Sequence, residues 1–249
     1  MSGPASRNLP VPTRALAVGA HPDDIEFQAG ATLAGWAAQG CEVSLVICTD
    51  GSKGTWDVNA DLDALVATRQ AEARAAATAV GATGSVVFLG VTDGELENDR
   101  PTRSALAKVI RELRPDVLLG HDPWKRYRLH PDHRAAGYLV CDALVAARDP
   151  HFFPEHGIAH HRPDALLLFE ADEPDHAEDA TEAGLAAKIA ALESHRSQYE
   201  STMFITDDPD ASAAEQARFR AGIRAELVEA GTWAGVELAE RFRFMPTDR

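Results

Sequence analysis

The chain has 249 residues, of which 45% are hydrophobic, so it is long enough to bury a sizeable core. Its formal net charge of −15 argues against the clustered basic surface that binds a nucleic-acid backbone. We therefore expect a globular protein that acts on a small molecule and has no nucleic-acid partner.

The predicted elements alternate between strand and helix along most of the chain. Short apolar runs predict strands, and Ala-rich runs with helical periodicity that end near glycine predict helices. In chain order we expect strand 14–20, helix 26–39, strand 43–48, helix 61–80, strand 85–89, helix 102–113, strand 116–120, helix 132–147, strand 164–169, helices 182–195 and 213–230, and a terminal edge strand 236–244. We interpret the acidic segment 170–181 as a solvated loop.

This alternation predicts an α/β fold with a Rossmann-like, mostly parallel sheet and helices on both of its faces. No internal repeat or linker divides the chain, so we expect a single domain over residues 1–249. Residues 1–13 carry three prolines and should be flexible. They lack the apolar core of a signal peptide, and no run reaches the about eighteen apolar residues of a membrane span.

The three cysteines, Cys41, Cys48 and Cys141, are odd in number and lie among apolar residues, which is typical of reduced thiols. We therefore expect a cytoplasmic protein without a membrane partner. A homo-oligomer is compatible with this sequence.

Two tetrapeptides follow apolar runs and carry an unusual density of reactive groups. The first box is His21-Pro22-Asp23-Asp24, and the second box is His130-Pro131-Asp132-His133. In open parallel sheets, ligands bind beyond the carboxyl ends of the strands near the point where the strand order reverses. Both boxes are predicted to occupy such positions, so they can meet and enclose one metal ion.

Two histidines and one carboxylate would leave one coordination position open, which is typical of a catalytic zinc. Such an ion lowers the pKa of a coordinated water and polarises a carbonyl. Each box also contains a protic group that the metal does not need, and these groups can act as acid and base. The alternative is that Asp23, Asp24 or Asp132 only caps the helix that follows it.

At these residues the sequence resembles the PIG-L, or LmbE-like, family of zinc-dependent N-acetylglucosamine deacetylases. Besides the two boxes, the resemblance rests on residues 25–26 and 30–34, Thr49-Asp50-Gly51-Ser52-Lys53-Gly54, Arg69 with Glu72, residues 89–90 and 93–94, residues 134–135, and Lys188 with His195, Ser197 and Gln198. It implies one zinc ion per chain, held by His21, Asp24 and His133. The implied substrate is a small molecule that contains N-acetylglucosamine.

The resemblance also implies roles for five further residues. Asp23 would be the general base, and His130 would stabilise the oxyanion and help the amine to leave. Asp132 would orient the imidazole of His130. Arg69 and Asp93 would contact the sugar.

Several alternatives remain open from the sequence. Mycothiol biosynthesis and mycothiol-conjugate amide cleavage share the same resemblance. A non-haem iron oxygenase also uses two histidines and one carboxylate.

A nucleotide-binding oxidoreductase is disfavoured, because the first turn reads Gly19-Ala20-His21-Pro22-Asp23 and lacks the G-x-G-x-x-G pattern. A sugar-binding module without catalysis would not require Asp23 beside the metal. Trp124 and Tyr127 either stack on the substrate or simply pack.

Overall fold

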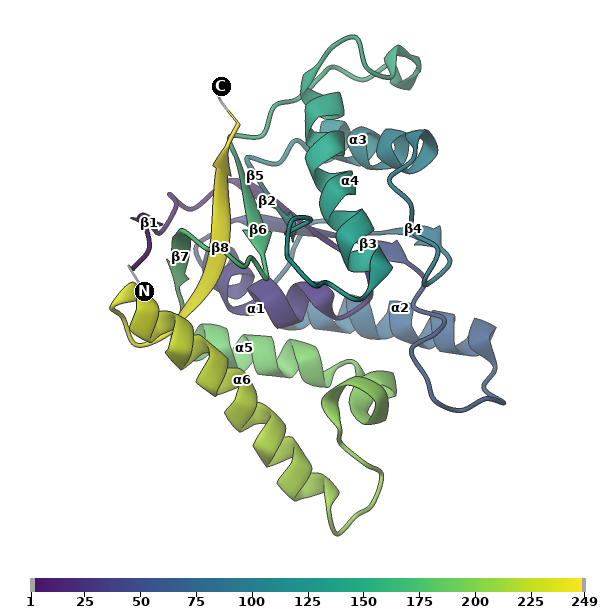
Figure 1. Ribbon diagram of the computed structural model, residues 1–249, viewed down its shortest axis with the longest axis vertical. Helices are drawn as coiled ribbons and strands as arrows, with labels where there is room; N and C mark the ends of the chain where they lie inside the picture. Colours follow the sequence, from purple (N-terminus) through teal and green to yellow (C-terminus); the bar gives the residue numbers. More distant parts are fainter. Residues whose placement is uncertain (1–2, 248–249) are drawn as a thin grey trace.

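The short apolar runs of the sequence form one eight-stranded sheet in the computed structural model, which describes residues 3–247 (Figure 1). The strands are β1 Ser6–Arg7, β2 Arg14–Gly19, β3 Glu42–Thr49, β4 Val86–Val91, β5 Val117–His121, β6 Ala165–Phe169, β7 His176–Asp179 and β8 Ala239–Pro246. Their order is β1-β7-β8-β6-β5-β2-β3-β4. Strand β8 runs antiparallel to β6 and β7, and the other neighbours are parallel, which confirms the mostly parallel sheet.

Helices cover both faces of this sheet, as expected (Figure 1). They are α1 Asp24–Ala37, α2 Leu62–Ala79, α3 Arg100–Leu113, α4 Pro131–Arg148, α5 Glu182–Glu193 and α6 Ser212–Ala234, with short 3-10 turns at Pro154–His156 and Arg196–Gln198 and a π-helix at Tyr199–Met203. Successive strand residues point to opposite faces. Leu118 packs with α3 and α4, whereas Leu119 packs with α1 and α2. Helix α5 lies against α1 and α2, and α6 lies against β8.

The strand order reverses between β2 and β5, and this reversal positions the two boxes. From β2 the chain moves outward to β3 and β4, and it then returns to the other side of β2 as β5. The first box follows β2, and the second box forms the N-cap and first turn of α4, the helix that comes after β5. Their expected place beyond the carboxyl ends of adjacent parallel strands is therefore confirmed.

The structure differs from the expected elements at the acidic segment and at the terminal strand. Strand β7 lies inside segment 170–181, where we expected a solvated loop, and its His176 and Glu178 are buried. Strand β8 is not an edge strand, because it pairs with β6 on one side and with β7 on the other. The acidic composition was misleading because Glu178 accepts hydrogen bonds from His176 and from the backbone N–H of Leu9.

The N-terminal segment, which we expected to be flexible, contributes β1, and Ser6 and Arg7 pair with β7. All three cysteines are free. None of the helices within residues 3–247 is both long and apolar enough to cross a membrane.

Candidate metal centre

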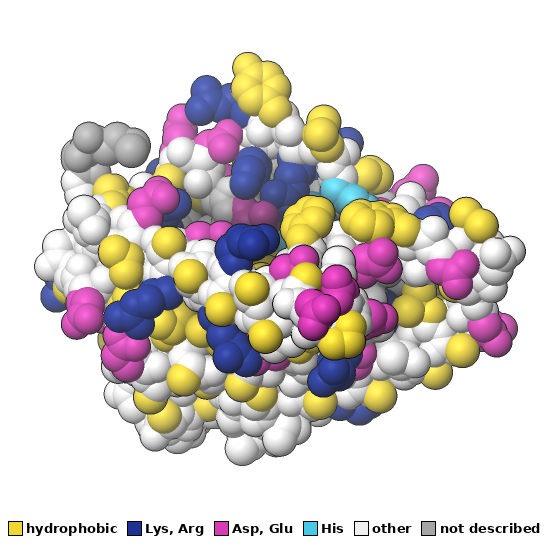
Figure 2. All heavy atoms as spheres, turned by 90° about the horizontal axis from the view of Figure 1, so that it is seen from below, with side chains coloured by type: hydrophobic (Ala, Val, Ile, Leu, Met, Phe, Trp, Pro, Cys, Tyr) yellow, Lys and Arg dark blue, Asp and Glu magenta, His cyan; other side chains and the backbone are white. Residues whose placement is uncertain are grey.

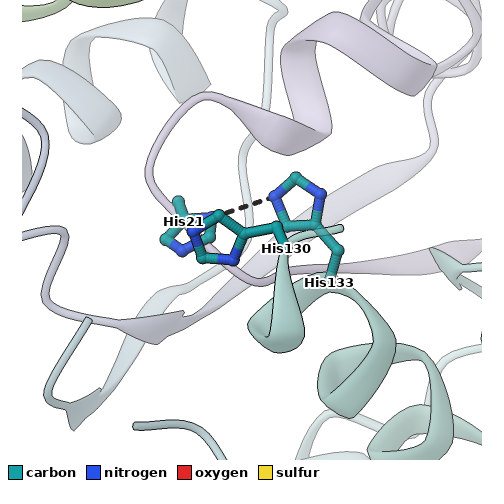
Figure 3. Close-up of side chains that lie close together, drawn as sticks. All are labelled: His21, His130 and His133. Atoms are coloured by element: carbon teal, nitrogen blue, oxygen red, sulfur yellow. Dashed lines mark hydrogen bonds between the residues drawn. The ribbon is translucent and has the colours of Figure 1, made fainter. Parts of the chain in front are cut away.

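The metal ligands that we expected lie together where β2 and β5 end. His21 Nδ1 lies 3.1 Å from His133 Nε2 and 3.4 Å from Asp24 Oδ2, and His133 Nε2 lies 3.2 Å from Asp24 Oδ1. Ligand atoms about 2.0–2.1 Å from a tetrahedral zinc ion are about 3.3 Å apart. Each of the three pairwise distances is close to this spacing, although His21 and His133 approach different oxygens of Asp24. Figure 3 shows His21 and His133 turned toward each other, with His130 beside them.

The other ring nitrogen of His21 faces two more carboxylates. His21 Nε2 lies 3.2 Å from Asp132 Oδ2 and 3.2 Å from Asp93 Oδ1. Burial opposes the charged imidazole, but hydrogen bonds to Asp132, Asp24 and Asp93 outweigh it and raise the pKa of His21 to about 12. The surrounding carboxylates thus favour a positive charge at this position, and a bound divalent cation would supply it.

Asp132 is buried and its carboxylate contacts His21 rather than the ring of His130. It accepts hydrogen bonds from the backbone N–H groups of Gly94, at 2.6 Å, and Leu96, at 3.2 Å. A carboxylate that holds the far nitrogen of a ligating imidazole fixes the ring orientation. His130 instead meets Asp132 through the backbone, because His130 Nδ1 accepts from the N–H of Asp132 at 3.3 Å.

Asp23 stands next to the ligand cluster in an unusual backbone conformation. Its φ of 113° lies in the region that side-chain-bearing residues rarely adopt. Its side chain makes no capping hydrogen bond to α1. Burial raises the pKa of Asp23 to about 6, although nearby Arg69 acts in the opposite direction.

The helix-capping alternative is not supported at the other two aspartates either. Asp24 Oδ2 accepts a hydrogen bond from the backbone N–H of His21 at 2.7 Å, and Asp132 binds the segment after β4. The side chain that caps α4 is His130. None of the three carboxylates therefore caps the helix that follows it.

A second set of side chains braces the ligands, and the sequence reasoning did not assign it a role. His121, the last residue of β5, places Nε2 3.2 Å from Asp24 Oδ2 and Nδ1 3.0 Å from Glu170 Oε2. Arg128 donates to Glu170 Oε1 at 2.7 Å and also contacts His133. The path Asp24, His121, Glu170, Arg128, His133 thus joins two of the expected ligands. The available signal was that His121 and Glu170 each stand at the end of a parallel strand.

Ser197 and Gln198, which belong to the C-terminal part of the resemblance, contact α2 and the loop that follows β3. Gln198 Nε2 donates to the carbonyl of Gly54 at 3.0 Å, and Ser197 Oγ donates to Glu72 at 2.6 Å. They therefore hold α2 and the loop together. His195 is fully buried 3.8 Å from Glu26.

The site opens into a cavity of about 440 Å³. Its walls are His21, Asp23, Asp24, Phe27, Gln28, Lys53, Gly54, Arg69, Asp93, His130, His133, Glu170, Gln198 and Thr202. Figure 2 shows a hollow on this side of the molecule, with basic and acidic side chains inside it and apolar side chains and a histidine at its margin. Ligand pockets typically measure about 300–1,000 Å³, so the cavity is large enough for a small molecule. Trp124 and Tyr127 lie outside this wall and are exposed.

Comparison with known proteins identifies relatives of the chain. Residues 16–144 match the model of the PIG-L family, described as GlcNAc-PI de-N-acetylase. The diacetylchitobiose deacetylase of Thermococcus kodakarensis is 29% identical over 94% of this chain and 83% of its own length. A 1D-myo-inositol 2-acetamido-2-deoxy-alpha-D-glucopyranoside deacetylase of Catenulispora acidiphila is 36% identical over 63% of this chain, and the match spans 56% of that protein.

A solved structure agrees with these matches. The N,N'-diacetylchitobiose deacetylase of Pyrococcus horikoshii superposes with a TM-score of 0.83 at 29% identity, over 95% of this chain and 85% of that one. The relatives and the structure named above are deacetylases, so the alternative of a non-haem iron oxygenase was wrong. The family match covers more than half of the sequence, and the chain therefore belongs to the PIG-L family.

Proposed function

We propose that the protein is a metal-dependent N-deacetylase that hydrolyses the acetamide of a small molecule containing N-acetylglucosamine. One observation carries the proposal. His21, Asp24 and His133 converge at 3.1–3.4 Å, and Asp23 and His130 line the same cavity. The named relatives, which act on diacetylchitobiose and on an acetamido-glucosyl inositol, support the substrate class.

His21, Asp24 and His133 would hold one zinc ion per chain. When bound, zinc activates water at neutral pH and polarises the acyl carbonyl. The chain's own residues would position this chemistry, because His121 and Asp132 fix the orientation of Asp24 and His21.

Asp23 is the proposed general base. Its carboxylate lines the cavity, and its pKa near 6 keeps it ionised but basic at neutral pH. It accepts the proton of the attacking water as the oxygen bonds to the acyl carbon. The carbon–nitrogen bond then breaks, and the nitrogen takes up a proton to leave as the free amine beside acetate.

His130 is proposed to face the negative charge that develops on the acyl oxygen. Because Nδ1 accepts from the backbone, the neutral ring carries its proton on Nε2, which is then a hydrogen-bond donor. The ring keeps this proton while it stabilises the oxyanion, and the proton that Asp23 accepted from water passes to the leaving nitrogen. Asp93 lines the cavity and is proposed to contact the sugar. Arg69 also lines it, but its hydrogen bonds go to the protein, so we assign it mainly to the orientation of Asp23.

The test measures free amine released from N-acetylglucosamine, N,N'-diacetylchitobiose, the acetamido-glucosyl inositol and a mycothiol-type amide, with zinc-loaded and chelator-treated protein. We expect metal-dependent release from at least one of them. Asp23→Asn should lower kcat by about 10²–10⁴-fold, the usual contribution of a general base, while the zinc content is retained.

Asp63→Asn, an exposed aspartate in the first turn of α2, is the matched control and should leave kcat unchanged. Full activity of the Asp23→Asn protein, or release that is insensitive to the chelator, would contradict the proposal.

The free cysteines support a reducing compartment, and we propose the cytoplasm. Homo-oligomerisation stays a prediction.

A further inference from the structure

A cavity of about 270 Å³ is lined by the second half of helix α1, by strand β7 and by residues 8–11, which join β1 to β2 (Figure 1). It shares no wall residue with the metal cavity. Its volume lies just below the about 300–1,000 Å³ that ligand pockets typically measure. The cavity is therefore large enough for a compact ligand of a few heavy atoms.

Thr32 on α1 brings an unpartnered polar group to this cavity. It lines the wall and only 2% of it is exposed, yet its hydroxyl group has no hydrogen-bond partner among residues 3–247. A buried hydroxyl group without a partner is destabilising, whereas a valine of the same shape would not be. An occupant of the cavity that hydrogen-bonds to this hydroxyl group would remove the penalty.

The charged groups in the wall are both acidic. Glu178 is buried and uses one oxygen, Oε1, to accept hydrogen bonds from His176 and from the backbone N–H of Leu9, both at 2.7 Å. Its other oxygen, Oε2, accepts none from the part of the chain that the structure describes. Asp179 pairs with Arg7 at 3.3 Å, but Arg7 lies outside the wall, and no described wall residue is basic. The cavity therefore attracts a cation rather than an anion.

The apolar part of the wall favours an organic cation over a metal ion. Leu9, Val11 and the buried indole of Trp36 contribute this surface. An alkyl chain gains free energy by covering it, whereas a hydrated metal ion would lose water there without replacement. A primary ammonium group carries three N–H donors, and it can therefore serve the Thr32 hydroxyl and two carboxylates at once.

We propose that this cavity is a second ligand site, separate from the metal centre, and that it binds a small organic cation with a primary ammonium group and a short apolar chain. The ammonium group donates to Thr32 Oγ1, to Glu178 Oε2 and to the carboxylate of Asp179. The apolar chain packs against Trp36. The inference does not depend on the proposed deacetylase function, because the two cavities share no wall residue.

The experiment measures the binding of butylamine to the zinc-loaded full chain by calorimetry at about pH 7, where this amine is a cation. 1-Butanol has the same chain without the charge, and tetramethylammonium has the charge without an N–H donor. Butylamine should bind with a Kd of about 1 mM, and both analogues about tenfold more weakly. Butylamine that does not bind, or that binds no more tightly than either analogue, would overturn the proposal.

Two variants with matched controls locate the bound amine. Thr32→Val removes the hydroxyl group at nearly constant shape, and Gly35→Leu extends a side chain from the wall, because nothing lies within 4 Å of a Cβ atom there. Each should weaken the binding of butylamine by about tenfold. Thr78→Val, at an exposed position of α2, and Gly222→Leu, with an equally open Cβ position on α6, should bind it as the wild type does. Undiminished binding in Thr32→Val or in Gly35→Leu would overturn the proposal.

Thermal unfolding gives a measure that is independent of calorimetry. Without ligand, Thr32→Val should have a Tm at least as high as the wild type, because it removes a buried hydroxyl group that has no partner. Butylamine should raise the Tm of the wild type by mass action and leave that of Thr32→Val nearly unchanged.

A change of charge separates this site from general attraction of the amine to an acidic protein. Glu178→Gln should lose most of the rise in Tm that butylamine causes. Glu42→Gln, at the exposed first position of β3, changes the net charge equally and should keep the rise. An equal rise in the two variants would show that the amine does not bind in this cavity, and would overturn the proposal.

Discussion

The guanidinium group of Arg69 donates a hydrogen bond of 2.6 Å to the carbonyl of Pro22 and lies 3.4 Å from the carboxylate of Asp23. The same group donates to the carbonyl of Gly51 at 2.9 Å, and only 3% of Arg69 is exposed. One buried cation therefore joins the loop after β3 to the strained turn that carries the proposed base.

Arg69→Lys should lower kcat by at least about tenfold, because an ammonium group cannot donate in the fork geometry that serves three acceptors. Its KM for N-acetylglucosamine should change less than its kcat, since the proposed effect is on the position of Asp23. Steady-state kinetics would show this split, and Arg74→Lys on the exposed side of α2 is the control. A loss confined to KM would mean that Arg69 acts mainly by binding the sugar.

Gly54→Ala should disrupt the same region. A Cβ atom at position 54 would lie 2.3 Å from Arg69 Nη1 and 2.8 Å from Gln198 Oε1, which is too close for any stable contact. Thermal unfolding should show a lower Tm, by several degrees. Gly222→Ala is the matched control, because nothing lies within 4 Å of its Cβ and it sits inside helix α6. That change should raise the Tm slightly, since alanine is the better helix former; a fall in Tm as large as that of Gly54→Ala would contradict the explanation.

Lys188→Met should be strongly destabilising. The ammonium group of Lys188 lies 2.6 Å from Glu240, and both side chains are almost fully buried. Removal of one partner of a buried ion pair costs about 3–5 kcal/mol, because the other charge is left without compensation. Urea denaturation measures the change in the free energy of unfolding. Arg224→Met, which breaks an exposed pair with Glu182, should have little effect.

Loss of Glu170 should alter the acid stability of the metal-free protein. Burial would raise the pKa of Glu170, but hydrogen bonds from His121 and Arg128 lower it to about 2, from 4.5. A carboxyl whose pKa is lower in the folded state contributes stability above pH 4.5 and loses it as the pH falls toward 2. The free energy of unfolding of the wild type should therefore fall as the pH drops from 4.5 to 2. That of Glu170→Gln should fall less, and the difference between the two proteins should reach up to about 3 kcal/mol. Glu200→Gln should follow the wild type; identical pH dependence in all three proteins would refute the role of Glu170.

His133→Ala should abolish stable zinc binding. It removes one of the three proposed ligands, and two protein ligands rarely retain zinc through dialysis. Elemental analysis should find about one zinc ion per wild-type chain and close to none in the variant. The exposed His151 provides the control, and His151→Ala should retain the ion. Equal zinc contents in both variants would show that the ion is held elsewhere.

The sequence is sufficient to predict the alternating elements from β2 to β6 and the meeting of the two boxes. Alternating apolar runs predict parallel strands, and the reactive groups of both boxes stand at strand ends, so their convergence follows from the topology. The contact between Asp132 and His21 could not be predicted, because it depends on how α4 docks beside the segment after β4. The role of Glu170 depends on the pairing of β5 with β6.

Local composition was the least reliable guide. The acidic residues of segment 170–181 predict a solvated loop, yet Glu178 is buried in a strand, where it accepts a hydrogen bond from the backbone N–H of Leu9. A hydrogen bond between residues so far apart in sequence cannot be read from a local window. The edge position expected for β8 was wrong for the same reason, because its second neighbour is β7, which the acidic pattern concealed.

The position of β8 also makes α1 depend on a strand that is synthesised much later. Glu240 on β8 accepts hydrogen bonds from the backbone N–H groups of Ala31 and Thr32 in α1, and the first of these pairs is separated by 209 positions in sequence. Contacts between residues so far apart require the closure of a large loop, which slows folding. While the ribosome is still translating the region before β8, α1 lacks these partners. The helix that opens with Asp24 can therefore reach its final geometry only after β8 has been made.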